Sequence, residues 1–132
     1  MSQHFIYPIS DGDSSKYVLP EDWPVPAKHG HTSTWRLARG WHQAKVDDYI
    51  WVYNSCTLKV LEAVGRVSKP PYEDSSEYQI EITWDGKLST ELLKNPIHLR
   101  DLSQETRKNL ISPIALVRGE TLEHLEQWKN SI

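Results

Sequence analysis

The sequence is poor in cysteine, in long apolar runs and in net positive charge. A lone Cys56 excludes a disulfide within the chain, and a reducing cytoplasmic compartment is therefore expected. No apolar stretch is long enough for a signal peptide or a membrane span, so no membrane partner is expected. The net charge of -3 argues against a protein that coats nucleic acid with its whole surface.

The chain has instead a segregation of charge and many amphipathic rings. Residues 23–46 contain four cations and no acid, whereas residues 71–91 contain six acids and one lysine. One part of the surface is therefore expected to attract a polyanion that another part repels. Six Trp and six Tyr stand against a single Phe. Such rings are favoured where a surface must both stack and form hydrogen bonds.

The clearest strand patterns lie between residues 49 and 67. From Tyr49 to Tyr53 the period of two predicts a core face with Ile50 and Val52 and, on the other side, an aromatic platform of Tyr49, Trp51 and Tyr53. Residues 58–67 are apolar on both faces, which predicts a strand buried on both sides. Gly65 within it indicates a bulge or a close backbone approach.

Further strands are predicted at residues 4–9, 78–84, 97–100 and 114–117, the first as an edge strand or a strand that stops abruptly near Pro8. The pattern predicts an acidic loop at 69–77, a turn at Asp85-Gly86 and an irregular segment up to Pro96. A turn or short helix is expected at 35–41, and helices are expected at 103–110 and from about Glu120. Residues 1–132 therefore read as one α+β domain, a small curled sheet or barrel of about five to six strands with short peripheral helices.

Metal and catalytic chemistry have little support in the residue pattern. His29 and His31 lack further ligands nearby, and the Ser/Asp run after Ile9 lacks EF-hand spacing, so no metal or cofactor is expected. Folding could gather titratable side chains, but no spacing identifies a working acid–base pair. Those side chains are His29, His31, His42, Asp48 and Cys56.

Several segments occur in the order found in one family. Phe5-Ile6-Tyr7 precedes polar Ser10-Asp11, Trp35-Arg36 precedes a stretch of the form i-x-x-G-D-x-v-x-x-Y, and residues 63–67 read a-V-G-x-V. The middle element is Val46 to Tyr53, with Asp47 at the position of the glycine. Residues 97–99 and 117–120 match later segments. This order resembles the EVE domain, a PUA-like fold related to YTH and ASCH domains.

The resemblance implies a reader of modified nucleic acid. EVE domains are thought to hold a flipped, modified base in an aromatic pocket, and several belong to bacterial defence proteins. Stacking is worth about 1–3 kcal/mol per base, and Trp35 is the principal candidate. A methylated or hydroxymethylated base in DNA or RNA is the expected ligand, with a nuclease domain as a further partner. The expected pocket comprises Tyr7, Ser10, Asp11, Trp35, Trp41 and Tyr53, and the expected phosphate contacts are Lys28, Arg36, Arg39 and Lys45.

The same residues are compatible with other roles. Trp35 and Trp41 also suit a protein core, Trp84 favours it, and the four cations also suit a solvated face. An ASCH-like ribonuclease is a competing function. A protein-interaction module is another, in which the aromatic platform meets a partner chain.

Overall fold

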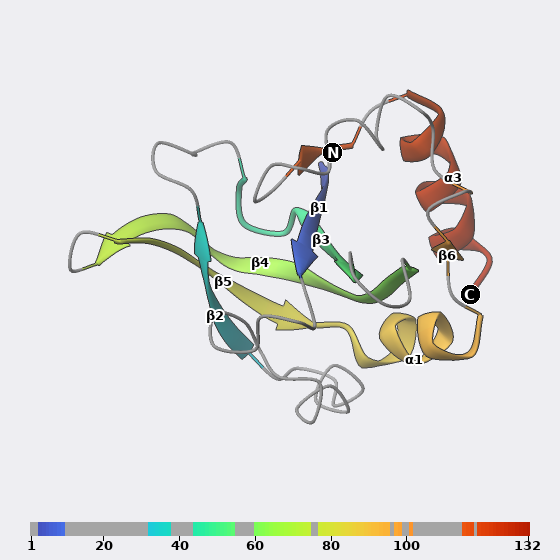
Figure 1. The fold of residues 1–132 in the computed structure, drawn as a ribbon, viewed down its shortest axis with the longest axis horizontal. Helices are drawn as coiled ribbons and strands as arrows, with labels where there is room; N and C mark the ends of the chain where they lie inside the picture. Colours follow the sequence, from blue (N-terminus) through green and yellow to red (C-terminus); the bar gives the residue numbers. More distant parts are fainter. Residues whose placement is uncertain are drawn as a thin grey trace.

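The computed structural model describes residues 3–9, 32–37, 44–54, 60–74, 77–95, 97–98, 101, 115–117 and 119–132 (Figure 1). No helix in these ranges has both the length and the apolar character needed to cross a membrane. In chain order the elements are β1 (His4–Ile9), β2 (Thr32–Leu37), β3 (Tyr49–Asn54), β4 (Val60–Asp74), β5 (Glu77–Trp84), α1 (Gly86–Lys94), β6 (Ile97–His98), β7 (Ala115–Leu116) and α3 (Gly119–Asn130).

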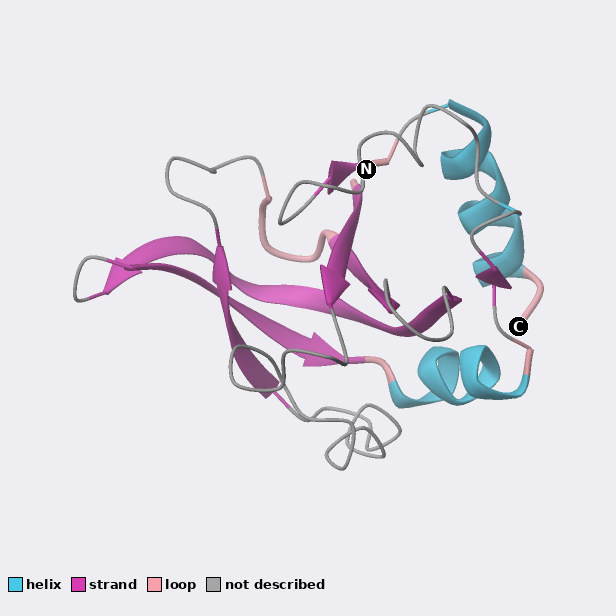
Figure 2. Ribbon diagram, in the orientation of Figure 1, coloured by secondary structure: helices cyan, strands magenta, loops and turns pink. Residues whose placement is uncertain are grey.

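The strands form one sheet in the order β2-β5-β4-β3-β1-β7, and β6 pairs with β4 beside this path. All pairs are antiparallel except β1 with β3. The sheet is strongly twisted, with α1 and α3 together at one end and the tip of the β4–β5 hairpin at the other (Figure 2). The expected class, a small curled α+β sheet with peripheral helices, is confirmed.

The central strands are buried on both faces and separate two cores. The first core contains Phe5, Tyr7, Ile50, Val52, Ile80, Ile82 and Trp84. The second contains Ile6, Tyr49, Trp51, Tyr53, Leu61 and Val64, together with Leu88, Leu92 and Leu125 of the helices. The strand buried on both sides is therefore confirmed for residues 60–67 of β4, and the core position of Trp84 is confirmed as well.

The predicted aromatic platform is not a free surface. Tyr49, Trp51 and Tyr53 are only 8%, 0% and 4% exposed. They pack in the core that contains the apolar side of α1 and α3. Alternation correctly placed these rings on one face, but a period of two cannot distinguish a solvated face from one covered by helices. A partner protein therefore cannot bind to these three rings as an exposed surface.

Gly65 lies where two strands approach closely, as expected. A Cβ at this position would lie 2.6 Å from Ile82 Cγ2, 2.8 Å from the Thr83 carbonyl oxygen and 3.0 Å from Trp84 Cε3. The irregularity between β3 and β4 lies elsewhere, between Val52 and Tyr53. Glycine is thus required at residue 65 for space.

The turn or short helix predicted over residues 35–41 is wrong for its described part. Residues 32–37 form β2, which pairs with β5 from Thr32 opposite Thr83 to Leu37 opposite Tyr78. The two threonine hydroxyls of the first pair lie 3.0 Å apart. Hydroxyl residues that could cap a helix are here β-branched strand residues, because pairing with β5 outweighs the local signal.

The expected Asp85-Gly86 turn and irregular segment are replaced by a helix. Asp85 is the N-cap of α1, and its carboxylate accepts a hydrogen bond from the Leu88 backbone N–H at 2.9 Å. Leu88 and Leu92, one helical turn apart, lie in the second core. An Asp-Gly pair suits a helix N-cap as well as a tight turn, and the strand that precedes it favoured the turn in the prediction.

The predicted acidic loop at 69–77 is mostly a hairpin. β4 continues to Asp74 and β5 begins at Glu77. The β4–β5 register shifts between Val67 and Lys69 and again between Lys69 and Tyr72, around Pro70 and Pro71. Prolines are tolerated in a strand where the ladder is interrupted, which explains why they do not end β4.

The remaining elements agree with expectation, with one exception. β1, β6, β7 and α3 coincide with predicted strands and with the predicted last helix. β1 is not an edge strand, since it lies between β3 and β7. Pro8 lies beyond the two β1 residues that pair with β7, Phe5 and Ile6, so its missing N–H costs no bond to that strand. The helix expected at 103–110 lies outside the described residues.

Candidate functional site

The predicted pocket residues are only partly brought together. Tyr7 is 4% exposed in the first core, and Tyr53 is 4% exposed in the second, so the sheet separates them. Burial raises the pKa of the Tyr53 phenol, which therefore stays neutral. Ser10, Asp11 and Trp41 lie outside the described residues, as do His29, His31, His42 and Cys56.

The predicted phosphate contacts are also divided. Arg36 follows Trp35 on β2, so the two positions belong to opposite faces of the strand. Arg36 lies opposite Gln79 on β5. The next pair on the same face of the sheet is Thr34 with Glu81. This neighbouring carboxylate weakens the attraction of that face for phosphate. Lys45 is exposed, and Lys28 and Arg39 lie outside the described residues.

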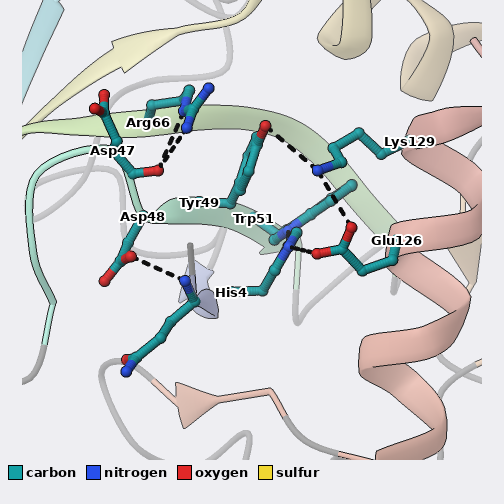
Figure 3. Close-up of polar contacts among 9 residues, drawn as sticks. His4, Asp47, Asp48, Tyr49, Trp51, Arg66, Glu126 and Lys129 are labelled. Carbon is teal, nitrogen blue, oxygen red and sulfur yellow. Dashed lines mark hydrogen bonds and ion pairs between the residues drawn. The ribbon is translucent and has the colours of Figure 1, made fainter. Parts of the chain in front are cut away.

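The structure reveals a buried polar cluster that the sequence pattern did not indicate (Figure 3). His4 is 0% exposed. Its Nδ1 accepts a hydrogen bond from Trp51 Nε1 at 2.9 Å, and its Nε2 lies 2.6 Å from Glu126 Oε1. Because an indole N–H can only donate, Nδ1 must be unprotonated and the hydrogen sits on Nε2. A neutral imidazole therefore donates to the Glu126 carboxylate.

The electrostatic shifts agree with this assignment. Burial lowers the pKa of His4, and the hydrogen bond and charge of Glu126 offset only part of the effect. Burial would raise the pKa of Glu126, but hydrogen bonds from His4 and Lys129 and their charges lower it overall. The contact is thus a neutral imidazole on a carboxylate instead of an ion pair.

Aromatic and cationic groups surround Tyr49, which lies beside the hydrogen-bonded residues Trp51, His4 and Glu126. The His4 ring stacks on Tyr49 with 4.6 Å between centroids and 12° between planes. Arg66 Cζ and Lys129 Nζ each lie 4.5 Å from the centroid of the Tyr49 ring. Lys129 also bonds Glu126 at 3.3 Å and donates to the Tyr49 hydroxyl at 3.5 Å. A groove of about 620 Å³ lies between the sheet and α3 and is lined by Tyr49, Arg66, Leu122, Glu123, Glu126, Gln127 and Lys129.

The turn before β3 supports Arg66 from the other side. Asp48 is buried, and its carboxylate accepts hydrogen bonds from the backbone N–H groups of Gln3 and Lys45, both at 2.9 Å. Asp47 has φ of +73°, in the left-handed region that favours glycine. The Asp47 carbonyl accepts from Arg66 Nε at 3.2 Å and Nη2 at 2.9 Å. A tight turn therefore forms at Asp47 although this residue is not a glycine.

The sequence shows the spacing of some members of the cluster but not their contact with His4. Glu126 and Lys129 are spaced three residues apart in a helical pattern, and Trp51 alternates with Tyr49 in a strand. Nothing local associates either pair with His4, which is 122 residues from Glu126. The cluster is accessible to sequence reasoning only once the docking of α3 is known.

The cluster predicts a stability that falls in mild acid. The His4 pKa is below its ordinary value of 6.5, so below pH 6.5 the unfolded chain binds a proton that the folded chain does not. The free energy of unfolding should therefore fall as the pH drops from 6.5, by at most about 1.4 kcal/mol per pH unit from this group. Glu126, whose pKa lies below its ordinary 4.5, adds a loss in the same direction below pH 4.5.

Urea unfolding of the wild type and of His4→Leu between pH 5 and 8 measures this effect. The wild-type curve should steepen below pH 6.5, whereas the variant should be flatter there. Equal slopes for the two proteins would contradict the assignment of a neutral His4.

The comparisons show similarity in fold. No protein-family model and no curated protein sequence matches the chain. Among solved structures, protein Atu2648 from Agrobacterium tumefaciens is similar with a TM-score of 0.62 at 15% identity, over 98% of this chain and 92% of that one. Rpa0253 from Rhodopseudomonas palustris is similar with a TM-score of 0.67 at 12% identity, over 98% and 94%. At these identities the likeness concerns the arrangement of the backbone.

Proposed function

We propose that this chain is a PUA-like, nucleic-acid-binding domain that reads a modified base. The observation that carries the proposal is the place of β2. β2 is the terminal strand in the sheet order, and Trp35 lies opposite Ile80, a member of the first core. Directly opposed positions in an antiparallel pair belong to the same face of the sheet. Trp35 is therefore on the side of the sheet that also carries Tyr7.

This arrangement supports a base pocket built from fewer residues than expected. Tyr7 and Trp35 derive from separate strands of one face, whereas Tyr53 belongs to the other core. In the described sheet β2 is paired on one side only, which leaves its other edge for single-stranded nucleic acid to approach. A base that leaves its stack recovers energy on an aromatic ring while polar groups read its edge. In the proposal Tyr53 has a packing role.

Replacing Trp35 by alanine tests the pocket. Loss of stacking of about 1–3 kcal/mol corresponds to a roughly 5- to 150-fold weaker affinity for the modified oligonucleotide. Affinity for the unmodified strand, which phosphate contacts dominate, should change much less. Binding is measured with oligonucleotides that differ in a single base, as cytosine, 5-methylcytosine or 5-hydroxymethylcytosine in DNA, or adenine and N6-methyladenine in RNA.

The matched control is Thr34→Ala, one position away on the same strand and exposed. It should leave both affinity and selectivity unchanged. Thermal melting of each variant is recorded alongside. A folded Trp35→Ala protein that retains full selectivity would remove Trp35 from the pocket, and a wild type that binds every oligonucleotide equally would remove the reader function.

A further inference from the structure

The groove between α3 and the sheet contains converging hydrogen-bond donors. Tyr49, Arg66 and Lys129 line it, from β3, β4 and α3 respectively. Both cationic centres lie 4.5 Å from the Tyr49 ring centroid, with the guanidinium and the ammonium on opposite sides of the phenol (Figure 3). α3 lies well apart from β2, so this groove is separate from the proposed base pocket (Figure 1).

The Tyr49 hydroxyl has an unused donor although it is nearly buried. The residue is 8% exposed, and its oxygen accepts a hydrogen bond from Lys129 Nζ. Within the part of the chain that the structure describes, no acceptor takes the phenol hydrogen. Such a hydrogen is normally satisfied when a tyrosine is buried, so its place in the groove indicates a ligand that accepts.

Lys129 and Tyr49 have more hydrogen-bond donors than Glu126 has oxygens to accept them. Of the two oxygens of Glu126, one takes the His4 hydrogen bond and the other lies 3.3 Å from Lys129. The ammonium has three N–H groups, and Glu126 and Tyr49 account for two. A third N–H and the phenol hydrogen therefore remain beside the guanidinium of Arg66. Donors of this kind suit an oxyanion.

We propose that this groove binds a phosphoryl group, either as inorganic phosphate or as a terminal phosphate monoester. A tetrahedral monoester offers three acceptor oxygens to donors from three side chains, whereas a carboxylate offers two oxygens in one plane. A phosphodiester, with two free oxygens, fits less well than a monoester. The proposal does not depend on the reading of a modified base.

Calorimetric titration with inorganic phosphate tests the site, with Tyr49→Phe as the principal variant. Tyr49→Phe removes the hydroxyl and keeps the ring that stacks on His4. Loss of one hydrogen bond to a charged group should weaken phosphate binding about 10-fold or more, and Lys129→Gln should weaken it by a similar factor. Lys94→Gln, an exposed lysine at the end of α1, is the matched control and should bind as the wild type does.

Further arms identify the ligand and its source. Glu123→Gln removes an exposed carboxylate from the groove and should tighten phosphate binding a few-fold. An oligonucleotide with a 5′-phosphate that binds tighter than its unphosphorylated form, in a Tyr49-dependent manner, would identify a terminal monoester as the source. Dependence on Tyr49 with inorganic phosphate alone would identify free phosphate.

Three results would overturn the proposal. They are no phosphate binding by the wild type at millimolar concentration, equal binding by wild type and a folded Tyr49→Phe, and acetate competing as well as phosphate. Thermal melting verifies that each variant is folded. If Lys129→Gln is unstable because it loses its contact with Glu126, Tyr49→Phe decides the outcome alone.

Discussion

Replacing Gly65 by alanine is expected to lower the free energy of unfolding by about 1–3 kcal/mol or more, as overpacking of a close-packed core does. The added methyl would meet Ile82 Cγ2 at 2.6 Å, and rotation of that side chain could relieve this contact. The contact at 2.8 Å with the Thr83 carbonyl is with backbone, which cannot yield unless β4 and β5 separate. Urea unfolding with an unchanged m-value measures the loss.

Two further variants distinguish the cost of steric overlap from the cost of an unfavourable backbone conformation. Gly119→Ala meets no atom within 4 Å but has φ of +63°, so its cost should be the left-handed strain of about 1–2 kcal/mol. In the Gly65→Ala background, Ile82→Ala should cost less than in the wild type, because it removes one of the clashes. A Gly65→Ala protein as stable as the wild type would show that the strands can part without penalty.

The second large effect is expected for His4→Leu. Leucine fills much of the space of the imidazole but leaves the buried Trp51 indole N–H without an acceptor, which costs about 1–3 kcal/mol. Glu126 also loses a donor, although its side chain is 37% exposed and water can replace part of that bond. The free energy of unfolding by urea at pH 7.5, where wild-type His4 is neutral in both states, measures the sum.

A double variant tests the physical cause. Trp51→Phe alone removes a partner of His4, but in the His4→Leu background it removes an unsatisfied donor. The second substitution should therefore cost less in the variant than in the wild type, with a coupling of about 0.5–3 kcal/mol. Strict additivity of the two losses would contradict a direct Trp51–His4 hydrogen bond.

Alternation of side chains made the centre of the sheet predictable. Ile80, Ile82 and Trp84 repeat every second residue and lie in one core, and Gly65 identified the close approach of strands. Strand period reports the face of each residue from neighbours alone, so it needs no knowledge of the fold. The amphipathic pattern of α3 was accessible for the same reason.

Elements whose local signals suit two structures could not be assigned in this way. Thr32 to Thr34 suit a helix cap or an edge strand, and Asp85-Gly86 suits a turn or the start of a helix. In each case the choice is made by what packs against the segment. β5 selects the strand in the first case, and the second core selects the helix for Leu88 and Leu92.

The candidate sites differ in the same way. Trp35 and Tyr7 are predicted from a family resemblance, which concerns single positions along the chain and does not depend on how the strands pair. Tyr49, Arg66 and Lys129 meet only because β3, β4 and α3 are docked. No spacing in the sequence predicts that these three residues line one groove.

The bond between His4 and Glu126 joins residues 122 positions apart, and this has a consequence for vectorial synthesis. A ribosome adds about 5–20 residues per second, so α3 emerges at least several seconds after β1. From their own emergence until α3 follows, Tyr49, Trp51 and Leu61 lack the helix that covers them, and they expose an apolar surface. The second core is therefore completed only after α3 has emerged, and nascent chains stalled before residue 119 should bind chaperones.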